Sequence, residues 1–223
     1  MSVVDIKSLI KAYPDPSGAG SVPVLDIESL KLEAGKHTAL RGTSGSGKTT
    51  LLHCISGMIL PESGSITLLD TDITTLSEAA RDRFRANHIG YIFQSFNLLD
   101  GFTALENVKL GMQFADKKLD TSRAAELLEK VGLKDRLHNK PSQLSVGQQQ
   151  RVCIARALAN DPEIILADEP TGSLDPKTSA EVLELIKEVA DGKTLMLVSH
   201  EEQVLSQFEV QLDLETLNRA MAL

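Results

Sequence analysis

The stretch Gly42-Thr43-Ser44-Gly45-Ser46-Gly47-Lys48-Thr49 decides the fold, because it fits the pattern G-x-x-x-x-G-K-[ST] of a phosphate-binding loop. The segment before it, His37 to Arg41, has the apolar alternation of a strand. The segment after it, Thr49 to Ile55, is a helical run that closes near Gly57. Because the motif requires a strand, a loop and a helix in this order, the sequence predicts an α/β fold with a nucleotide site.

The residue types in this loop suit a polyphosphate. Gly42, Gly45 and Gly47 let the backbone approach closely enough for successive N–H groups to point at phosphate oxygens. The start of the following helix adds a partial positive charge. Lys48 is expected to reach the β and γ phosphates and Thr49 to offer its hydroxyl to Mg²⁺. A glycine-rich turn with an exposed lysine is the alternative, which the eight matched positions disfavour. The predicted nucleotide-binding residues here are Gly42, Thr43, Ser44, Gly45, Ser46, Gly47, Lys48, Thr49 and Thr50.

A second group of polar residues follows the apolar run Ile164-Ile165-Leu166-Ala167. This run ends in Asp168-Glu169, and the carboxyl end of a strand is where α/β sheets place ligands. Asp168 is expected to hold Mg²⁺, directly or through water, and Glu169 to polarise the attacking water as the base. An ordinary turn or helix-start pair of acids is the alternative reading, which the phosphate loop makes less favourable.

The rest of the chain is consistent with a single α/β domain of 223 residues that carries a helical insertion. Short β-type runs dominate up to about Gln94, and a helical pattern follows from about Ser95 to Gln143. The expected strands are Val3 to Ile6, Val24 to Leu32, His37 to Arg41, Ser65 to Leu69, Ile89 to Phe93, Ile164 to Ala167 and Thr194 to Val198. The expected helical stripes are Ala124, Leu127, Leu128 and Val131, and Val182, Leu185, Ile186 and Val189. A turn-rich loop is expected from Pro14 to Gly20.

Composition excludes several classes of protein. The chain is 42% hydrophobic and 24% charged with a net charge of −8, which argues against nucleic acid as a partner. Two cysteines, Cys54 and Cys153, cannot form a disulfide framework and are expected to be reduced. No window approaches the roughly 18 apolar residues of a membrane helix, and the start lacks the pattern of a secretory signal. We therefore expect a cytoplasmic chain without direct membrane insertion.

Further motifs occur in a fixed order along the chain. They are Tyr13, Gln94 at the end of a strand, Leu144-Ser145-Val146-Gly147-Gln148-Gln149-Gln150-Arg151, Ser173-Leu174-Asp175 and His200 after the last buried strand. With the phosphate loop and Asp168-Glu169, they make nearly the whole chain resemble an ATP-binding cassette (ABC) ATPase. The resemblance implies a P-loop NTPase core of the RecA-like type with an N-terminal antiparallel β subdomain and an inserted α-helical subdomain. The implied boundaries are about 1–94 and 152–223 for the core and about 95–151 for the helical part.

The resemblance also implies roles for these residues. Tyr13 would stack on adenine, Gln94 would contact Mg²⁺ and water, and His200 would contact the γ phosphate. Ser145, Gly147 and Gln148 would bind the ATP held by the other subunit of a head-to-tail homodimer. The catalytic set is thus Glu169, His200, Lys48 and Gln94, the Mg²⁺ set is Thr49, Gln94 and Asp168, and the cofactors are ATP and Mg²⁺.

Each of these roles has an ordinary structural alternative. Ser145 also suits a plain N-cap for a helix running to Asn160, Tyr13 suits simple packing, and His200 a satisfied surface or core histidine. Gln94 could be an ordinary amide at a strand end. Val146 replaces the usual glycine of the motif, and a β-branched residue would be strained there at positive φ but tolerated within the first helical turn.

Within the family, the segments around Gln94 and Asp168 are similar to the branch that serves lipoprotein release, macrolide and peptide efflux and cell division. This implies a separate integral membrane permease, with the chain bound peripherally at the cytoplasmic face of the membrane. The segment from Ser95 to Val108, with Phe96, Leu98, Leu99 and Phe102, would receive the permease, although some of these side chains equally suit the core of the helical part. A nucleotide-gated regulatory ATPase and a soluble ATPase of iron–sulfur assembly are the alternatives. The sequence does not encode the transported substrate.

Overall fold

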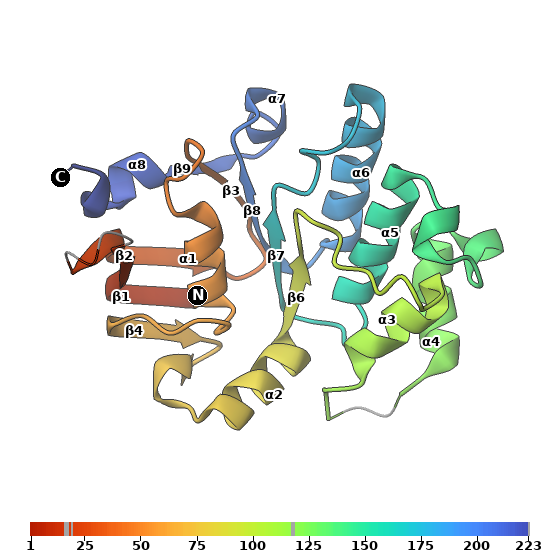
Figure 1. Cartoon of the computed structure of the whole chain (residues 1–223), viewed down its shortest axis with the longest axis horizontal. Coiled ribbons are helices and arrows are strands. Elements are labelled where there is room, and N and C mark those ends of the chain that lie inside the picture. Colours follow the sequence, from red (N-terminus) through yellow and green to blue (C-terminus); the bar gives the residue numbers. More distant parts are fainter. Residues whose placement is uncertain (16–17, 19, 117–118, 223) are drawn as a thin grey trace.

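The computed structural model describes residues 1–15, 18, 20–116 and 119–222. Pro16, Ser17 and Ala19 of the expected turn-rich loop lie outside the described residues. Figure 1 shows a sheet seen nearly edge-on at the centre of the molecule, an antiparallel sheet on one side of it and a group of helices on the other. This confirms the expected mixture of a P-loop type core, an antiparallel β part and a helical part.

The central sheet is entirely parallel and has the strand order β6-β7-β8-β3-β9. Its strands are β3 (His37–Arg41), β6 (Ile89–Ile92), β7 (Ile164–Asp168), β8 (Thr194–Ser199) and β9 (Val210–Asp213). Helix α1 (Lys48–Ile55) follows β3, α6 (Pro176–Val189) follows β7 and α7 (Glu202–Leu205) follows β8. Four of these strands, β3, β6, β7 and β8, therefore agree to within a residue or two with the strands expected from the sequence.

The second sheet is antiparallel, with the order β2-β1-β4-β5. Its strands are β1 (Ser2–Pro14), β2 (Ser21–Glu33), β4 (Ser63–Leu68) and β5 (Thr71–Asp72). Ile6 of β1 pairs with Leu30 of β2 on one side and with Ile66 of β4 on the other. The β1 and β2 strands are longer than expected because their pairing continues past Ile6, as far as Pro14 opposite Ser21.

Two hydrophobic cores lie on opposite faces of the parallel sheet. Ile164 and Leu166 of β7 join the core shared with the antiparallel sheet and α1, whereas Ile165 and Ala167 join the core shared with the helical part. Since alternate residues of a strand point to opposite faces, this explains why β7 is a continuous apolar run. A strand held from both sides ends at a well-defined place, which fixes the position of Asp168 and Glu169.

The helical part contains α3 (Ala104–Met112), α4 (Thr121–Lys130) and α5 (Val146–Ala157), with 3-10 turns at Lys134–Arg136 and Pro141–Gln143. The expected stripe on α4 is confirmed, since Ala124, Leu127 and Leu128 are buried. Gly132, just after this helix, has a φ of +77° that suits glycine at a helix end. The helix that begins after Ser145 ends at Ala157 rather than at Asn160. Among the helices that the structure describes, none has the length and apolar character needed to span a membrane.

Two elements differ from the sequence-based expectation. The stretch before Gln94 is not only β-type, because it contains a 3-10 turn (Ile73–Thr75) and α2 (Glu78–His88). No residue of α2 is buried, so the helix has no apolar stripe that periodicity could detect, although Ser77 caps it by accepting from the Ala80 N–H. The segment after Phe208 forms β9, α8 (Leu214–Leu217) and a 3-10 turn (Arg219–Ala222), which the sequence did not predict.

Candidate nucleotide site

A cavity of about 440 Å³ lies at the carboxyl end of the parallel sheet, where α/β folds bind ligands. Its lining combines the phosphate loop with residues from both sheets. The lining residues are Tyr13, Val24, Ser44, Gly45, Gly47, Lys48, Thr49, Thr50, Gln94, Glu169 and His200. Most of the predicted site residues are therefore brought together, from segments up to 187 positions apart in the chain (200 − 13).

The phosphate loop leaves the N-terminus of α1 open to a ligand. Gly47 is the N-cap residue, with a φ of +99° and no side-chain hydrogen bond to the first turn of the helix. A Cβ atom at this position would lie 2.9 Å from Cδ2 of Leu25, so both the backbone angle and the space require glycine. The unpaired amide groups of this first turn are the donors that a phosphate group accepts from.

Lys48 is held inside the loop. Its side chain is 8% exposed, and its ammonium group donates to the carbonyl oxygens of Gly42 and Thr43, at 2.8 Å each. The same nitrogen lies 3.7 Å from Oε1 of Glu169. Lys48 thus places a positive charge between the loop and the acidic end of β7.

Asp168 is a buried carboxylate next to the loop helix. Burial raises its pKa above the ordinary value, the charge of Glu169 adds to this, and a hydrogen bond from the side chain of Thr49 acts in the opposite direction. Its Oδ1 is buried without a hydrogen-bond partner. A hydroxyl and an unpartnered carboxylate oxygen side by side are ligands that Mg²⁺ accepts in nucleotide sites, where phosphate oxygens and water complete the shell.

The remaining metal chemistry within the described residues is limited. No group of three or more His, Cys, Asp or Glu side chains in this part of the chain is arranged to hold a metal ion by itself. The Thr49 and Asp168 pair fits a cation that arrives with a nucleotide rather than a resident metal centre.

Glu169 lies at the strained point where β7 ends. Its φ is +44°, and its backbone N–H donates to the carbonyl of Val198, so the neighbouring strand fixes this backbone. Oε1 lies 2.8 Å from Nδ1 of His200, and Oε2 accepts from the Ser199 hydroxyl at 3.4 Å. The side chain is 7% exposed, so a buried carboxylate is aimed at the cavity by three neighbours.

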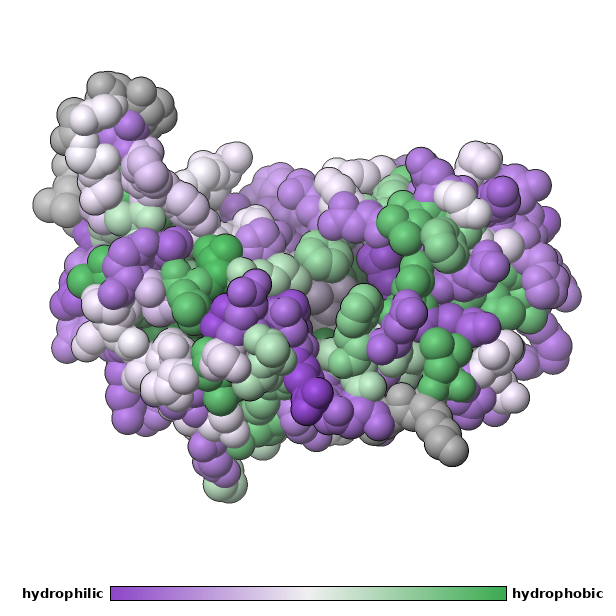
Figure 2. Space-filling model, turned by 60° about the horizontal axis from the view of Figure 1, so that its bottom comes forward, coloured by the Kyte–Doolittle hydropathy of each residue, from purple (hydrophilic) through white to green (hydrophobic). Residues whose placement is uncertain are grey.

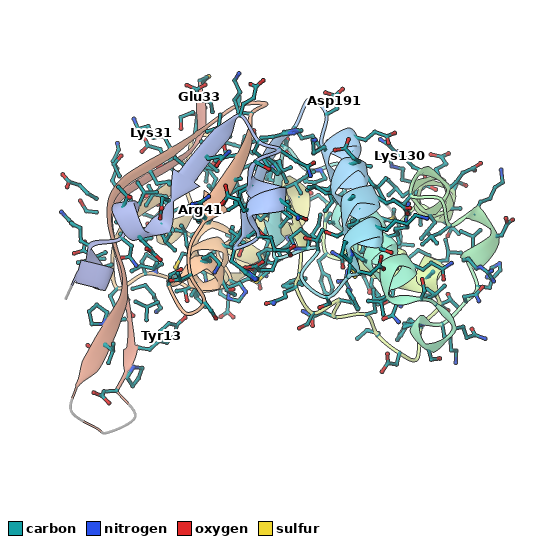
Figure 3. All side chains as sticks on the ribbon, turned by 90° about the horizontal axis from the view of Figure 1, so that it is seen from above. Tyr13, Lys31, Glu33, Arg41, Lys130 and Asp191 are labelled. Atoms are coloured by element: carbon teal, nitrogen blue, oxygen red, sulfur yellow. The ribbon has the colours of Figure 1, made fainter. Side chains whose placement is uncertain are left out.

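Tyr13 and Gln94 both line the cavity, from different sheets. Tyr13 is 41% exposed at the end of β1, where the β1–β2 hairpin leaves the body of the protein (Figure 3). The Lys11 ammonium lies 5.3 Å from the centre of its ring. Gln94 follows β6 and also lines a neighbouring hollow together with Gln149 and Ser173.

Ser145, Gly147 and Gln148 do not line this cavity, although the sequence assigned them to a nucleotide site. They form the N-terminus of α5, where the Ser145 hydroxyl accepts from the Gln148 N–H and the Gln148 side chain accepts from the Ser145 N–H. The N-cap interpretation of Ser145 is therefore confirmed. Val146 lies in the first turn without positive φ, so the expected strain does not arise. A Cβ at Gly147 would lie 2.6 Å from Cγ2 of Thr178, which explains glycine there.

Two residues near the cavity were missed by the sequence reasoning. Val24 lines the cavity from β2, and nothing in its local sequence distinguishes it from other apolar strand residues. Ser199 bonds Glu169 and also accepts from the Glu201 N–H. Its position directly before His200, at the end of a buried strand, was the available signal.

A phosphate loop, a strand-end carboxylate pair and a histidine on the neighbouring strand define a P-loop nucleoside triphosphatase. Comparison with known proteins specifies the family. A family model described as "ABC transporter" matches residues 25–172. An uncharacterized ABC transporter ATP-binding protein of Thermotoga maritima is 47% identical over 208 residues, which cover 92% of this chain and 88% of that protein.

A longer relative is the macrolide export ATP-binding/permease protein MacB of Bdellovibrio bacteriovorus, 43% identical over 203 residues. These residues are 91% of this chain but only 31% of MacB, so the chain spans about a third of that relative. Among solved structures, this chain is similar to the ATP-binding cassette MJ0796 in its dimeric post-hydrolysis state bound to ADP and Pi. The TM-score is 0.87 and the sequence identity 37%, over 97% of this chain and 95% of that one. The chain belongs to the ABC transporter family and is an ATP hydrolase of the cassette class.

Proposed function

We propose that this chain is the ATP-driven subunit of a transporter, which closes as a head-to-tail dimer around two ATP molecules and moves a separate membrane permease. The observation that carries the proposal is the division of the site residues. Lys48, Glu169 and His200 share one cavity, whereas the residues at the start of α5, Ser145, Gly147 and Gln148, lie outside it. A second copy of the chain is the natural source of the missing contacts.

In this proposal the triphosphate lies along the phosphate loop. The open N–H groups at the start of α1 bind phosphate oxygens, and Lys48 exchanges its bonds to the Gly42 and Thr43 carbonyls for the β and γ phosphates. Thr49 and Asp168 would hold Mg²⁺, which neutralises charge on the phosphates when bound. Gln94 would contact the same ion or its water, and Tyr13 would stack on the base.

Hydrolysis needs a base placed beside the γ phosphate. Glu169 is the candidate, because its carboxylate is buried, faces the cavity and is oriented by His200 and Ser199. It would accept a proton from the attacking water as the water oxygen bonds to phosphorus and the bond to the leaving ADP oxygen breaks. His200, whose ring is mostly exposed to the cavity side, would contact the γ phosphate.

Dimer closure follows from the same charge chemistry. The N-terminus of α5 carries a partial positive charge and exposes Ser145, so it suits a γ phosphate held by the opposite subunit. Closure lasts only while the γ phosphate is present, because that group supplies the differential contact between the open and closed states. ATP binding and hydrolysis would thereby alternate the spacing of the two subunits.

The membrane permease is proposed to bind between the core and the helical part. Leu99 and Phe102 are 49% and 40% exposed, whereas Leu98 packs against the helical core, so only part of the expected apolar surface is free. A groove of about 680 Å³ lies nearby, and Phe114 at its edge is 74% exposed. Figure 2 shows hydrophobic residues on both sides of a depression on this face.

One residue of the groove, Arg156, contacts the segment that follows Gln94. Arg156 lines the groove and donates to the carbonyls of Phe96 and Asn97, at 2.8 and 2.6 Å. A permease segment in the groove would therefore contact the side chain that fixes the residues next to Gln94. With such a permease, the proposed location is peripheral, at the cytoplasmic face of the membrane. Recovery of the chain without any membrane subunit after detergent extraction would favour a soluble ATPase instead.

The decisive experiment replaces the proposed base. Glu169→Gln keeps the size of the side chain but cannot accept the proton, so turnover should fall by roughly 10²- to 10⁴-fold. ATP binding should persist, and the variant should accumulate as a dimer in the presence of ATP, measured by size-exclusion chromatography with light scattering. Wild-type turnover together with a monomer in ATP would show that Glu169 is not the base.

A further inference from the structure

The segment that follows β9 is folded against the nucleotide site, although none of its residues belongs to a recognised motif. Leu214–Leu217 and Arg219–Ala222 form two short turns of helix, and Asn218 between them makes an isolated antiparallel bridge with Ile27 of β2. Figure 1 shows α8 lying beside β2. The segment therefore packs on the strand whose Val24 lines the cavity.

Asn218 connects this strand to the phosphate loop through one buried amide. Asn218 is 2% exposed, and its Oδ1 accepts from the Asp26 N–H at 2.7 Å. Its Nδ2 donates to the carbonyl of Val24 at 2.8 Å and, more weakly, to that of Ser46 at 3.4 Å. A single rigid group thus bonds two cavity walls that are distant in sequence.

The two walls that Asn218 connects are close-packed. A Cβ at Gly47 would lie 3.1 Å from the Val24 carbonyl oxygen, so strand and loop touch at this point. One wall continues along β2 to Val22, which pairs with Tyr13, and the other is the phosphate loop itself. Because a nucleotide must contact both walls at once, the spacing between them sets how well base and phosphates fit together.

Glu215 makes a second connection from the same segment. Its Oε1 accepts from the hydroxyl of Thr43 in the phosphate loop at 2.8 Å. Neither Glu215, Asn218 nor Thr43 lines the cavity, so all three act from behind its surface.

We propose that Asn218 and Glu215 are positioning residues for the nucleotide, which hold the phosphate loop at a fixed distance from the wall formed by Tyr13 and Val24. The proposal rests on the nucleotide site described above and adds a role for the C-terminal segment. The chain's own contacts supply a matched control: Arg219 binds the side chains of Asp26 and Glu28 on the same strand, and among the described residues its side chain has no hydrogen bond to the loop.

The experiment compares binding of Mg-ATP with binding of inorganic pyrophosphate, which needs only the phosphate loop. Asn218→Asp preserves size and the acceptor for Asp26 but cannot donate to the Val24 and Ser46 carbonyls. Asn218→Asp and Asn218→Ala should each weaken Mg-ATP binding about tenfold, whereas pyrophosphate binding should stay unchanged. Glu215→Ala should weaken Mg-ATP binding roughly threefold, and Glu215→Gln, which still accepts from Thr43, should restore it.

The control and the contrary outcomes separate positioning from general stability. Arg219→Ala should change the melting temperature slightly and leave both affinities unchanged. The positioning role is wrong if wild type binds Mg-ATP well and Asn218→Asp and Glu215→Ala bind it with the same affinity. It is also wrong if these variants lose affinity for pyrophosphate and for Mg-ATP to the same extent. If wild type does not bind Mg-ATP, the proposed function fails instead. Glu215→Ala provides the test if the Asn218 variants do not fold.

Discussion

The two helices proposed to meet ATP, α1 and α5, begin in opposite ways. Helix α1 starts after Gly47, in left-handed conformation and without a side-chain cap. Helix α5 starts after Ser145, with a complete capping box formed by Ser145 and Gln148. The first helix therefore presents free amide donors within each chain, whereas in the second the backbone N–H of Gln148 already donates to the Ser145 hydroxyl.

This difference bears on how the two ends can bind a phosphate. The backbone amides at the start of α1 are ready to bind because no side chain caps them, and only the Lys48 ammonium exchanges bonds when phosphate arrives. The start of α5 must either share the Ser145 hydroxyl with a phosphate oxygen or use its remaining amides. We infer that α1 provides affinity in the single chain, whereas α5 contributes only when a second chain brings a nucleotide to it.

Among the changes that test this difference between α1 and α5, the largest effect is expected from Ser145→Asp. Aspartate is as good an N-cap as serine, so α5 should stay stable, but its charge would face the γ phosphate of the opposite subunit. ATPase turnover should fall about a hundredfold while Mg-ATP binding to the monomer is retained, since like charges brought together cost several kcal/mol. Steady-state ATPase assays and equilibrium titration measure the two quantities. If the residue is only a cap, turnover in Ser145→Asp will equal that of wild type.

A somewhat smaller effect is expected at the other helix. Gly47→Ala forces a side chain into a φ of +99° and against Leu25, so the loop must shift. Mg-ATP affinity should fall roughly ten- to a hundredfold, because backbone strain of this kind costs about 1–3 kcal/mol. Equilibrium titration measures the loss, and unchanged affinity would show that the open helix start does not set binding.

Ser145→Ala tests the role of Ser145 as a helix cap separately from its proposed role in binding phosphate. Loss of the cap should lower stability by about 1 kcal/mol, which corresponds to a fall of roughly 2–4 °C in melting temperature for a chain of this size. Differential scanning fluorimetry of the nucleotide-free protein measures it. Ser145→Asp serves as the control with an intact cap and should melt like wild type.

The smallest effect concerns the buried carboxylate next to α1. Because burial and the charge of Glu169 raise the pKa of Asp168 above 3.8, the folded chain holds this proton more tightly than the unfolded chain does. The free energy of unfolding therefore falls as the pH rises from 3.8 through the raised pKa of the folded chain, and it stays lower above that pKa.

Asp168→Asn removes this titration, so without nucleotide and in the presence of EDTA the variant should melt above wild type at neutral pH. Melting curves across the acidic range check the sign, and a variant less stable than wild type at neutral pH would contradict it. The variant should nevertheless lose Mg²⁺-dependent hydrolysis.

The parts predicted from sequence are those whose signal is local. The strand before Asp168 was recognisable because it is apolar on both faces, and a buried strand fixes where its last residues lie. The phosphate loop was recognisable because glycine is required where the backbone turns into α1. Ser145 was expected to cap a helix, and it does.

The parts that were missed depend on distant or weak signals. Helix α2 buries no residue and so carries no stripe. Asn218 bonds the Asp26 N–H from 192 positions away, and no local pattern connects them. Only the family resemblance predicted that Ser145 lies away from the cavity, because it assigns this residue to the ATP of the other subunit. The sequence of one chain does not show the contacts that a second chain would supply.

The strand order of the parallel sheet also determines how this protein can fold as it is made. Strand β3, which leads into the phosphate loop, lies between β8 and β9, so both of its neighbours come from residues 194–213, which follow β3 by more than 150 positions (194 − 41 = 153). Until they leave the ribosome, β3 has two open edges and part of its apolar surface uncovered. Pairing over such long sequence separations slows folding, so the core around the phosphate loop is expected to form only after β8 and β9 have been made.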